Sequence, residues 1–259
     1  MKEHYLLNAN RKLLTYRKTK PGLLTFELDL PQLYDSKEHL AAFMSRFKEF
    51  LKSDSYNRHI YRLRDNILVF NSEQLIPSKI DSRPPLLLVF GNPASHSVKE
   101  GMFFSFEGDG KEHRFWKDIM RPIKLLEMSV ERDIPFEEKN RIRKKKILDL
   151  KYRSPYCIGF SVFVSLPSGP SGPWSGIGGI HKLLGARAMK MLEPFERKRI
   201  VKIVSTQLGI PIIFSDAVKP VSVQYIGGSI GCVSYPSPSY RLFCLPFKDR
   251  GCKEHRSCV

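Results

Sequence analysis

Polar and turn-forming residues follow a short apolar run near the middle of the chain. Residues 86–90 read LLLVF, and Gly91-Asn92-Pro93 comes directly after them. The side-chain amide of Asn92 can donate a hydrogen bond and accept another, so it can orient a water molecule without acting as a strong base. Asn also tolerates the left-handed backbone of a turn, which is the structural alternative for this residue. Asn92 is therefore the first candidate for chemistry.

Aromatic residues and a second turn-rich loop add further candidates. Phe103, Phe104 and Phe106 follow the turn, and a flat ring can stack on a flat ligand or pack in the core. Residues 235–241 read YPSPSYR, and their hydroxyl groups and single cation suit contact with phosphate. Both groups matter only if the fold brings them to Asn92.

Four short apolar segments predict the strands that would position these side chains. The segments are 86–90, 156–164, 210–214 and 231–235. Helical patterns lie between them at 114–126 and at 183–208, the latter with an expected break at Pro194. The alternation predicts an α/β fold, a three-layer α/β/α domain with a mostly parallel four-stranded central sheet. Ligands bind such sheets at the carboxyl ends of the strands, where Asn92 stands.

Residues 1–80 are expected to form a helical N-terminal extension packed on a core domain of residues 81–259. Asp35-Ser36 can cap a helix that keeps its apolar residues on one face, at Leu40, Phe43, Phe47 and Leu51. Residues 71–74, with the sequence NSEQ, are a second plausible helix start.

The motifs resemble those of the uracil-DNA glycosylase superfamily, nearest to its mismatch-specific (G:T/U) and single-strand-selective branches. Those branches carry a Gly-x-Asn-Pro turn after the first strand, an aromatic residue about a dozen residues on, and an Asn-Arg-Phe-Trp helix start. They end with a His/Asn-Pro-Ser loop followed by a wedge and an Arg. The matching residues occur here in the same order: Gly91-Asn92-Pro93, Phe104, Arg114-Phe115-Trp116, Pro236-Ser237 and Arg241. The resemblance spans residues 86–241 and does not extend to the first 80.

This resemblance implies a DNA glycosylase of base-excision repair, which hydrolyses the N-glycosidic bond of a flipped-out damaged base. Asn92 would position the attacking water, and Phe104 would stack on the extruded base, with Phe103 and Phe106 as competitors. Gly91 and Ser165 would complete the base-binding pocket. In the last loop the resemblance implies contacts to DNA from Pro236, Ser237, Ser239, Tyr240 and Arg241. For Arg241 an ordinary surface cation is the alternative.

Two positions depart from the family pattern. Tyr235 stands where several branches have a His that helps to neutralise the leaving base, and a phenol with a pKa of ~10 donates a hydrogen bond but carries no charge. Tyr235 is therefore the second catalytic candidate, with slower catalysis expected. Ser165 stands nearest the place of an Asn that reads the uracil edge, and a hydroxyl discriminates less than an amide. Uracil, thymine opposite guanine, hypoxanthine and other lesions thus remain open as substrates.

The charge of the chain favours a polyanionic partner. It carries 43 Lys and Arg against 26 Asp and Glu, a formal net charge of +17. Nucleic acid is the commonest polyanion that a basic protein meets, so DNA, duplex or single-stranded with a damaged base, is the expected partner. Anionic membrane surfaces and ribosome-like assemblies are alternatives. The densest basic run, residues 139–146, fits a solvated helix face or a phosphate contact.

Composition also guides the expected setting of the protein. No apolar run reaches the ~18–20 residues of a membrane span, and residues 1–20 lack the pattern of a signal peptide. A monomeric cytoplasmic protein of a bacterial or archaeal cell, associated with the nucleoid through DNA, is expected. Five cysteines indicate free thiols. Cys244, Cys252, His255 and Cys258 lie close in sequence but include no Cys-x-x-Cys pair, so no metal and no cofactor are expected.

Three functions are weighed on this sequence. The first is a metal-independent, monofunctional glycosylase, and the second is a nucleic-acid-binding protein that kept the fold but has weak or no catalysis. The third, a nucleotide or small-molecule hydrolase of unrelated lineage, lacks any Asp/Glu/His cluster to support it. The Gly/Pro/Ser-rich loop 168–179 either approaches DNA or lies on the surface, and His96 is either a ligand of phosphate or base or an exposed turn residue.

Overall fold

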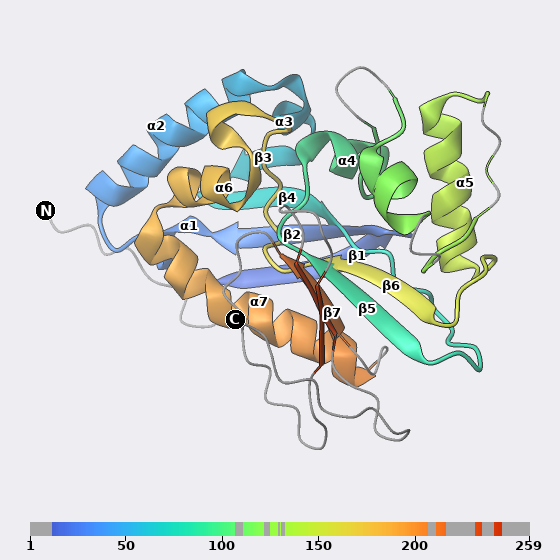
Figure 1. Cartoon of the computed structure of the whole chain (residues 1–259). Coiled ribbons are helices and arrows are strands. Elements are labelled where there is room, and N and C mark those ends of the chain that lie inside the picture. The colour runs from blue at the N-terminus through green and yellow to red at the C-terminus, as the bar shows by residue number, and fades with distance from the viewer. Residues whose placement is uncertain are drawn as a thin grey trace, which may run out of the picture.

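The computed structural model describes residues 12–106, 111–121, 125–128, 130 and 133–206, and the backbone of three strands at 211–215, 231–234 and 241–244. The described elements form two sheets with helices packed around them (Figure 1). None of the described helices is long and apolar enough to cross a membrane.

The N-terminal region is built on a four-stranded antiparallel sheet, so the predicted helical extension is wrong. The strand order is β1-β2-β4-β3, with β1 (Leu14–Lys20), β2 (Leu23–Asp29), β3 (Tyr61–Arg64) and β4 (Ile67–Glu73). Buried residues alternate along β2 at Leu24, Phe26 and Leu28, the period of a half-buried strand. Residues 71–74, expected to start a helix, instead end β4 and continue beyond it.

Local turn chemistry explains the two hairpins of this sheet. Asp65 and Asn66 between β3 and β4 both have positive φ, 47° and 63°, as a tight two-residue hairpin turn requires. Gly22 between β1 and β2 has φ +82°, a conformation that glycine adopts without strain.

Three helices accompany this sheet, and one of them was predicted. They are α1 (Leu30–Leu33), α2 (Lys37–Ser53) and α3 (Ser55–Ile60). The Ser36 side chain accepts from the backbone N–H of His39 at 3.1 Å, which caps α2 as expected. Phe43, Phe47 and Phe50 are the buried side chains of α2.

The second sheet is mixed, so the predicted three-layer domain on one mostly parallel four-stranded sheet is wrong. Its order is β6-β5-β7-β9-β8, with β5 (Pro85–Phe90), β6 (Cys157–Val162), β7 (Pro211–Ser215), β8 (Gly231–Ser234) and β9 (Arg241–Cys244). Strands β6, β5 and β7 are parallel, whereas β9 is antiparallel to both neighbours. All four predicted strands form, but β9 was not predicted, and its first residue, Arg241, was assigned to a loop.

Helices of the second half connect these strands. They are α4 (Ser95–Glu100), the π-helix η1 (Phe115–Met120), α5 (Phe136–Leu148), the 3₁₀ turn η2 (Gly172–Trp174), α6 (Gly176–Leu184) and α7 (Ala186–Thr206). The helix expected over 114–126 is therefore only the short η1. The break expected at Pro194 is instead at Gly185, which ends α6 with φ +90°, and Pro194 lies inside α7.

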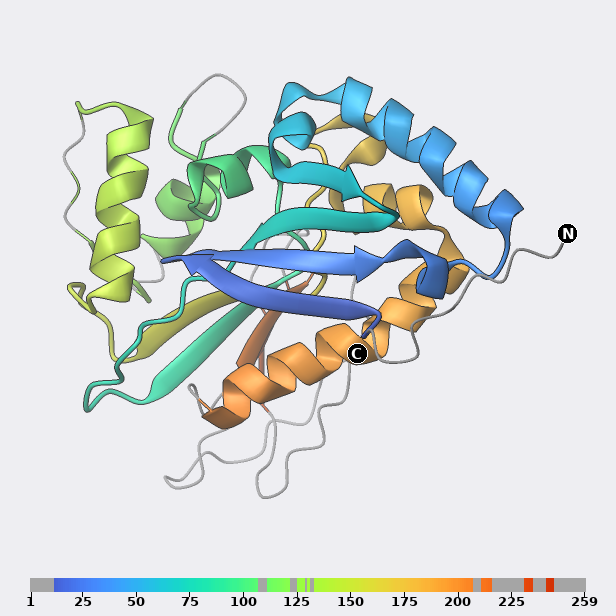
Figure 2. The ribbon, with the colours of Figure 1, turned by 180° about the vertical axis from the view of Figure 1, so that it is seen from behind.

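Helix α7 packs against both sheets and so connects their two cores (Figures 1 and 2). Its first half contributes Ala188 and Leu192 to the core of the antiparallel sheet, which also includes α2 and α6. Its second half packs Ile200 and Ile203 against Leu87 and Val89 of β5. A backbone bridge between Leu75 and Phe160 also ties the end of β4 to β6. Strands β5 and β6 are thus held by buried contacts from α7 and from the end of β4.

Candidate active site

The loops after β5 and β6 leave the sheet at the same edge and are tied together. The parallel register runs from Pro85↔Cys157 to Phe90↔Val162, so both strands end side by side. Backbone bonds continue the pairing, from Val164 N–H to the Gly91 carbonyl at 2.8 Å and from Ser95 N–H to the Ser168 carbonyl at 2.8 Å. We call this region the carboxyl edge.

Asn92 lies at the carboxyl edge and is half-buried. Its Nδ2 donates to the carbonyl oxygens of Pro93 at 3.2 Å and Leu166 at 3.3 Å. Because both hydrogen bonds use Nδ2, the carbonyl oxygen of the Asn92 side chain is the group that can accept a hydrogen bond from water. The loop after β6 therefore orients the side chain of Asn92, the residue predicted to position water.

Phe104 lies beside the end of β5 in a strained backbone conformation. Its φ is +51°, uncommon for a bulky residue, and such strain clusters at functional sites. Its half-buried ring stacks on Phe115 at 4.0 Å between centroids and meets the edge of Phe90 at 5.0 Å. The indole Nε1 of Trp116 donates to the Phe104 carbonyl at 2.9 Å, which holds this backbone.

The two competitors of Phe104 have other surroundings. Phe103 is 2% exposed and belongs to the core around β5 and β6. Phe106 packs on Phe136 and His96, at 4.6 Å and 4.8 Å between ring centroids. His96 itself is half-buried and within 3.4 Å of the Ser97 hydroxyl, so the exposed-turn interpretation of this histidine does not fit.

Gly91 and the loop 168–179 pack closely at this edge. A Cβ on Gly91 would stand 3.1 Å from Ile177 of α6, and a Cβ on Gly179 would overlap the backbone of Trp174. Trp174 is 5% exposed and meets the Phe50 ring at 5.9 Å. The Trp of this loop is thus a core residue, while Cβ atoms on Gly172, Gly176 and Gly178 would meet nothing within 4 Å.

Ser165 is fully buried and bonded inward. Its backbone N–H and its hydroxyl both donate to the Glu196 carboxylate, at 2.7 Å and 2.5 Å. Glu196 also pairs with Arg199 of α7 at 2.8 Å, and both of these side chains are 2% exposed. The Arg199 guanidinium donates to the Ser161 hydroxyl and to the carbonyls of Val162 and Phe163.

Sequence reasoning missed the residues that hold the loop after β6. Glu196 and Arg199 stand three positions apart on α7. A sequence signal that this helix face is buried comes from its apolar residues, Leu192, Ile200 and Ile203. Tyr61 was also missed. Its hydroxyl donates to the Pro167 carbonyl at 2.5 Å, and burial raises the pKa of Tyr61 well above its usual value, so the phenol stays neutral.

The last predicted loop lies largely outside the described residues. Tyr235, Pro236, Ser237, Ser239 and Tyr240 are among those not described, and Arg241 is described in its backbone alone. The flanking residues are placed, however. Arg241 pairs with Ser215 at the end of β7 and with Ser234 at the end of β8, and β7 is parallel to β5. Both flanks of this loop therefore lie at the carboxyl edge.

The described residues contain no group of three His, Cys, Asp or Glu side chains placed to hold a metal ion. Cys244 ends β9, whereas Cys252, His255 and Cys258 lie outside the described residues. Comparisons of the chain with protein-family models, curated proteins and solved structures found no match.

Proposed function

We propose that this chain is a DNA glycosylase of base-excision repair, which hydrolyses the N-glycosidic bond of a flipped-out uracil or a related deaminated or mismatched base. The observation that carries the proposal is the convergence of three segments at the carboxyl edge. These are Asn92, the strained Phe104, and the chain on either side of residues 235–240. Residues 235–240 are far in sequence from Asn92 and Phe104, and ligands of such sheets bind at this edge.

The proposed chemistry divides between Asn92 and Phe104. An extruded base stacks on the Phe104 ring, whose orientation is set by Phe115 behind it. Asn92 holds a water against the sugar carbon, and its amide is oriented by the Leu166 carbonyl. Water attacks the sugar carbon as the sugar becomes oxocarbenium-like, and the C–N bond breaks with its electron pair on the base. The proton that the water loses is the proton that the base gains. No metal ion is needed for this division of roles.

In this proposal groups other than the Ser165 hydroxyl recognise the base. Because that hydroxyl donates to Glu196, reading a base through Ser165 would require breaking a buried hydrogen bond. Backbone groups beside Gly91 and Asn92 are the nearer candidates. This arrangement favours an enzyme that accepts several related lesions over one with strict selectivity for uracil.

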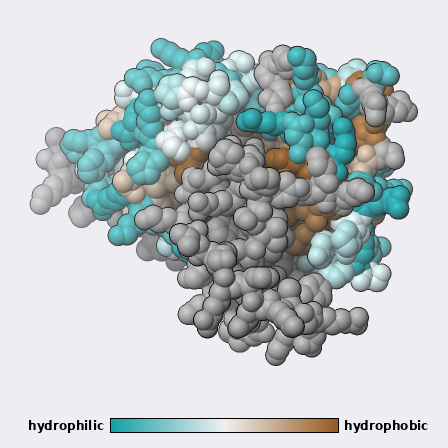
Figure 3. Space-filling model, in the orientation of Figure 1, coloured by the Kyte–Doolittle hydropathy of each residue, from teal (hydrophilic) through white to brown (hydrophobic). Residues whose placement is uncertain are grey.

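Charge supports DNA as the partner in this proposal. Hydrophilic residues cover much of the described surface on the face shown in Figure 3, and the net charge is +17. A basic protein that contacts phosphates releases counterions, which makes its binding to DNA salt-dependent. In this proposal the protein acts as a monomer in the cytoplasm of a bacterial or archaeal cell, associated with the nucleoid through DNA.

A base-release assay on the native chain tests the proposal. Oligonucleotides carrying uracil, thymine opposite guanine, hypoxanthine or ethenocytosine are incubated with excess protein, and abasic sites are revealed by alkaline cleavage. Release from at least one substrate, in single- or double-stranded form, is expected. Folded protein that releases none of these bases contradicts the proposal.

A second candidate is a nucleic-acid-binding protein that has this site but weak or no catalysis. The inward bonding of Ser165 favours it, because the position that reads the base in many family members is occupied here by a structural contact. Salt-dependent DNA binding without release of any of the four bases would support this second candidate.

A further inference from the structure

Ile177 is an apolar side chain at the carboxyl edge that lies outside the hydrophobic cores. It stands in the first turn of α6 and is half-buried, yet it belongs to none of the three hydrophobic clusters formed by the described residues. The glycines on either side of it, Gly176 and Gly178, are exposed, and a Cβ on either would meet nothing within 4 Å. Ile177 is therefore the one side chain in an otherwise open stretch, residues 176–178.

Gly91 leaves room for Ile177 at the end of β5. A Cβ on Gly91 would stand 3.1 Å from Cδ1 and 3.6 Å from Cγ1 of Ile177, and the first of these distances is tighter than ordinary van der Waals contact. The backbone of Gly91 is not left-handed, so its conformation does not require a glycine. Space for Ile177 therefore explains why a residue without a side chain precedes Asn92.

Ile177 and Phe104 lie on opposite sides of the end of β5. Successive side chains of a strand point to opposite faces of the sheet, and the pairing with the β6 segment continues through the Gly91 carbonyl. Phe90 faces the cluster on which Phe104 packs, whereas the position of Gly91 faces Ile177. Asn92 thus follows a strand end that has an aromatic ring on one side and an aliphatic side chain on the other.

Hydrogen bonds connect the turn that carries Ile177 to the loop that carries Asn92. The backbone N–H of Gly176 donates to the Ser168 hydroxyl oxygen at 2.9 Å, and the N–H of Ser168 donates to the Pro93 carbonyl at 2.9 Å. A side chain contacts a ligand reproducibly only when the element that carries it is held in place. Two successive hydrogen bonds therefore keep Ile177 and Asn92 at the same edge.

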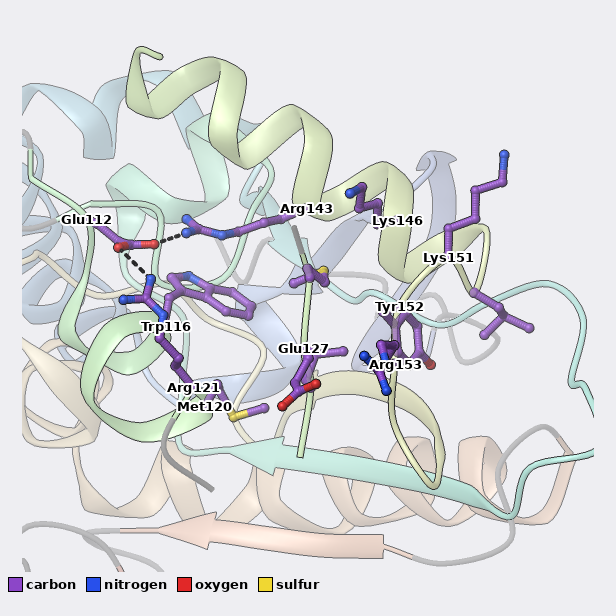
Figure 4. A pocket seen from close by; sticks show the side chains of 13 residues that line it. Glu112, Trp116, Met120, Arg121, Glu127, Arg143, Lys146, Lys151, Tyr152 and Arg153 are labelled. Atoms are coloured by element: carbon purple, nitrogen blue, oxygen red, sulfur yellow. Dashed lines mark hydrogen bonds and ion pairs between the residues drawn. The ribbon is translucent and has the colours of Figure 1, made fainter. Parts of the chain in front are cut away.

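The opposite side chain, Phe104, is supported in a comparable way. Its carbonyl accepts from Nε1 of Trp116 at 2.9 Å, and Trp116 is 4% exposed. Figure 4 shows Arg143, which is paired with Glu112, beside the indole of Trp116, and its guanidinium lies 5.2 Å from the ring centroid. The backbone of Phe104 is thus held by a tryptophan that is itself packed against an ion pair.

We propose that Ile177 is a specificity-determining residue, which forms the apolar wall of the base pocket opposite Phe104 and limits the size of the base that fits between them. This inference rests on the proposed function, because it concerns the same carboxyl edge. Flipped bases are held by stacking between aromatic and apolar side chains. An aliphatic wall offers no hydrogen bond, so it selects by size, and the bicyclic bases hypoxanthine and ethenocytosine need more space than uracil and thymine do.

Binding measurements that need no catalysis test this wall directly. The probes are single-stranded oligonucleotides with 2′-fluoro-2′-deoxyuridine, whose glycosidic bond resists hydrolysis, or with an abasic analogue at the same position. The native chain should bind the base-bearing probe at least about tenfold more tightly, since stacking adds contacts. Ile177→Ala should reduce this ratio by at least about fivefold, and Ile177→Val should reduce it less, because fewer apolar groups leave the pocket.

The outcomes of this titration separate the two proposals. An unchanged ratio in folded Ile177→Ala protein would overturn the assignment of Ile177. No preference of the native chain for the base-bearing probe would overturn both the wall and the glycosylase. A preference that Ile177→Ala removes, without release of any base from the four-lesion panel, would count against the glycosylase proposal alone.

The selectivity of base release is a readout that a merely structural role would not move. Ile177→Ala should raise the ratio of ethenocytosine release to uracil release by at least about tenfold, and Ile177→Phe should lower it, because the first change widens the space and the second narrows it. A ratio that moves in the same direction in both variants would overturn the proposal.

Two other isoleucines are matched controls. Ile80 is 48% exposed and precedes β5, at the opposite end of that strand from Asn92, so Ile80→Ala should keep the native ratios. Ile180 lies one turn after Ile177 on α6 but is fully buried in the core, so Ile180→Ala should lower the urea midpoint more than Ile177→Ala does. Equal losses of stability in these two α6 variants, with native ratios in Ile177→Ala, would show that Ile177 only packs and would overturn the proposal.

Discussion

The loops after β5 and β6 leave the same sheet edge side by side but differ in how deeply their polar side chains are buried. The loop after β5 carries a half-buried amide on Asn92 and leads to Phe104, which has a half-buried ring and a positive backbone φ. The loop after β6 is bonded inward, through Ser165 to Glu196 and through Pro167 to Tyr61. In the proposed site the first loop would contact the substrate, and the second loop would support the first. Substitutions in the two should affect different properties.

The largest effect should come from the buried ion pair behind the supporting loop. Glu196→Ala leaves Arg199 charged, buried and without its carboxylate. It also removes the acceptor to which the backbone N–H and the hydroxyl of Ser165 donate. Loss of one partner of a buried pair costs about 3–5 kcal/mol of unfolding free energy. Urea denaturation measures this loss.

A matched control stands on the same helix. Glu193 and Arg197 also pair across α7, but their side chains are 45% and 42% exposed. Glu193→Ala should therefore cost no more than about 1 kcal/mol. Equal losses in the two variants would show that burial of the Glu196–Arg199 pair does not support the loop.

Substitutions of Phe104 and of its neighbour Phe103 distinguish contact with the substrate from packing in the core. Base stacking on an aromatic ring is worth about 1–3 kcal/mol by alanine substitution, so Phe104→Ala should lower kcat/KM for base release by about 10- to 100-fold. Unfolding free energy should change less than in Phe103→Ala, which removes a core ring and should cost about 3–5 kcal/mol. If Phe104→Ala releases base at the native rate, the ring does not contact the substrate.

A smaller effect is expected at Tyr61. Tyr61→Phe removes the hydroxyl that donates to the Pro167 carbonyl and should cost about 1 kcal/mol of unfolding free energy. Tyr34→Phe is the control, since its hydroxyl donates to the Leu184 carbonyl at 2.9 Å, outside the loops after β5 and β6. Base release should slow in Tyr61→Phe and not in Tyr34→Phe. Equal rates would mean that this hydrogen bond does not orient the loop.

Elements with a local sequence signal could be predicted, and elements that depend on long-range packing could not. The continuous apolar run of β5 and the capped, single-faced α2 are local signals, and both were predicted. The alternation of Leu24, Phe26 and Leu28 in β2 was an available signal for a strand that the predicted helical extension overlooked. Helix α7 continues past Pro194 because its two halves are packed against two different cores, a tertiary effect that no local signal contains.

Prediction of the candidate site was limited in the same way. The turn at Asn92 follows a recognisable strand, so it could be selected, whereas Phe104 was selected over Phe103 and Phe106 only by its spacing in the family resemblance. The acceptor of the Ser165 hydroxyl stands 31 residues away on α7, and the Pro167 carbonyl binds a residue 106 positions earlier. Such long-range partners depend on how the two sheets share α7, which the sequence pattern did not indicate.

The most direct test of the central claim is single-turnover base release by Asn92→Ala, measured beside the native chain on the best substrate of the four-lesion panel. Loss of a contact made in the transition state should lower the rate by about 10²- to 10³-fold while duplex DNA affinity stays within about twofold. Asn71→Ala, an amide on β4 bonded to Thr25, is the control and should keep the native rate. A native rate in Asn92→Ala, with the protein folded, would contradict the account and remove the carboxyl edge from the chemistry.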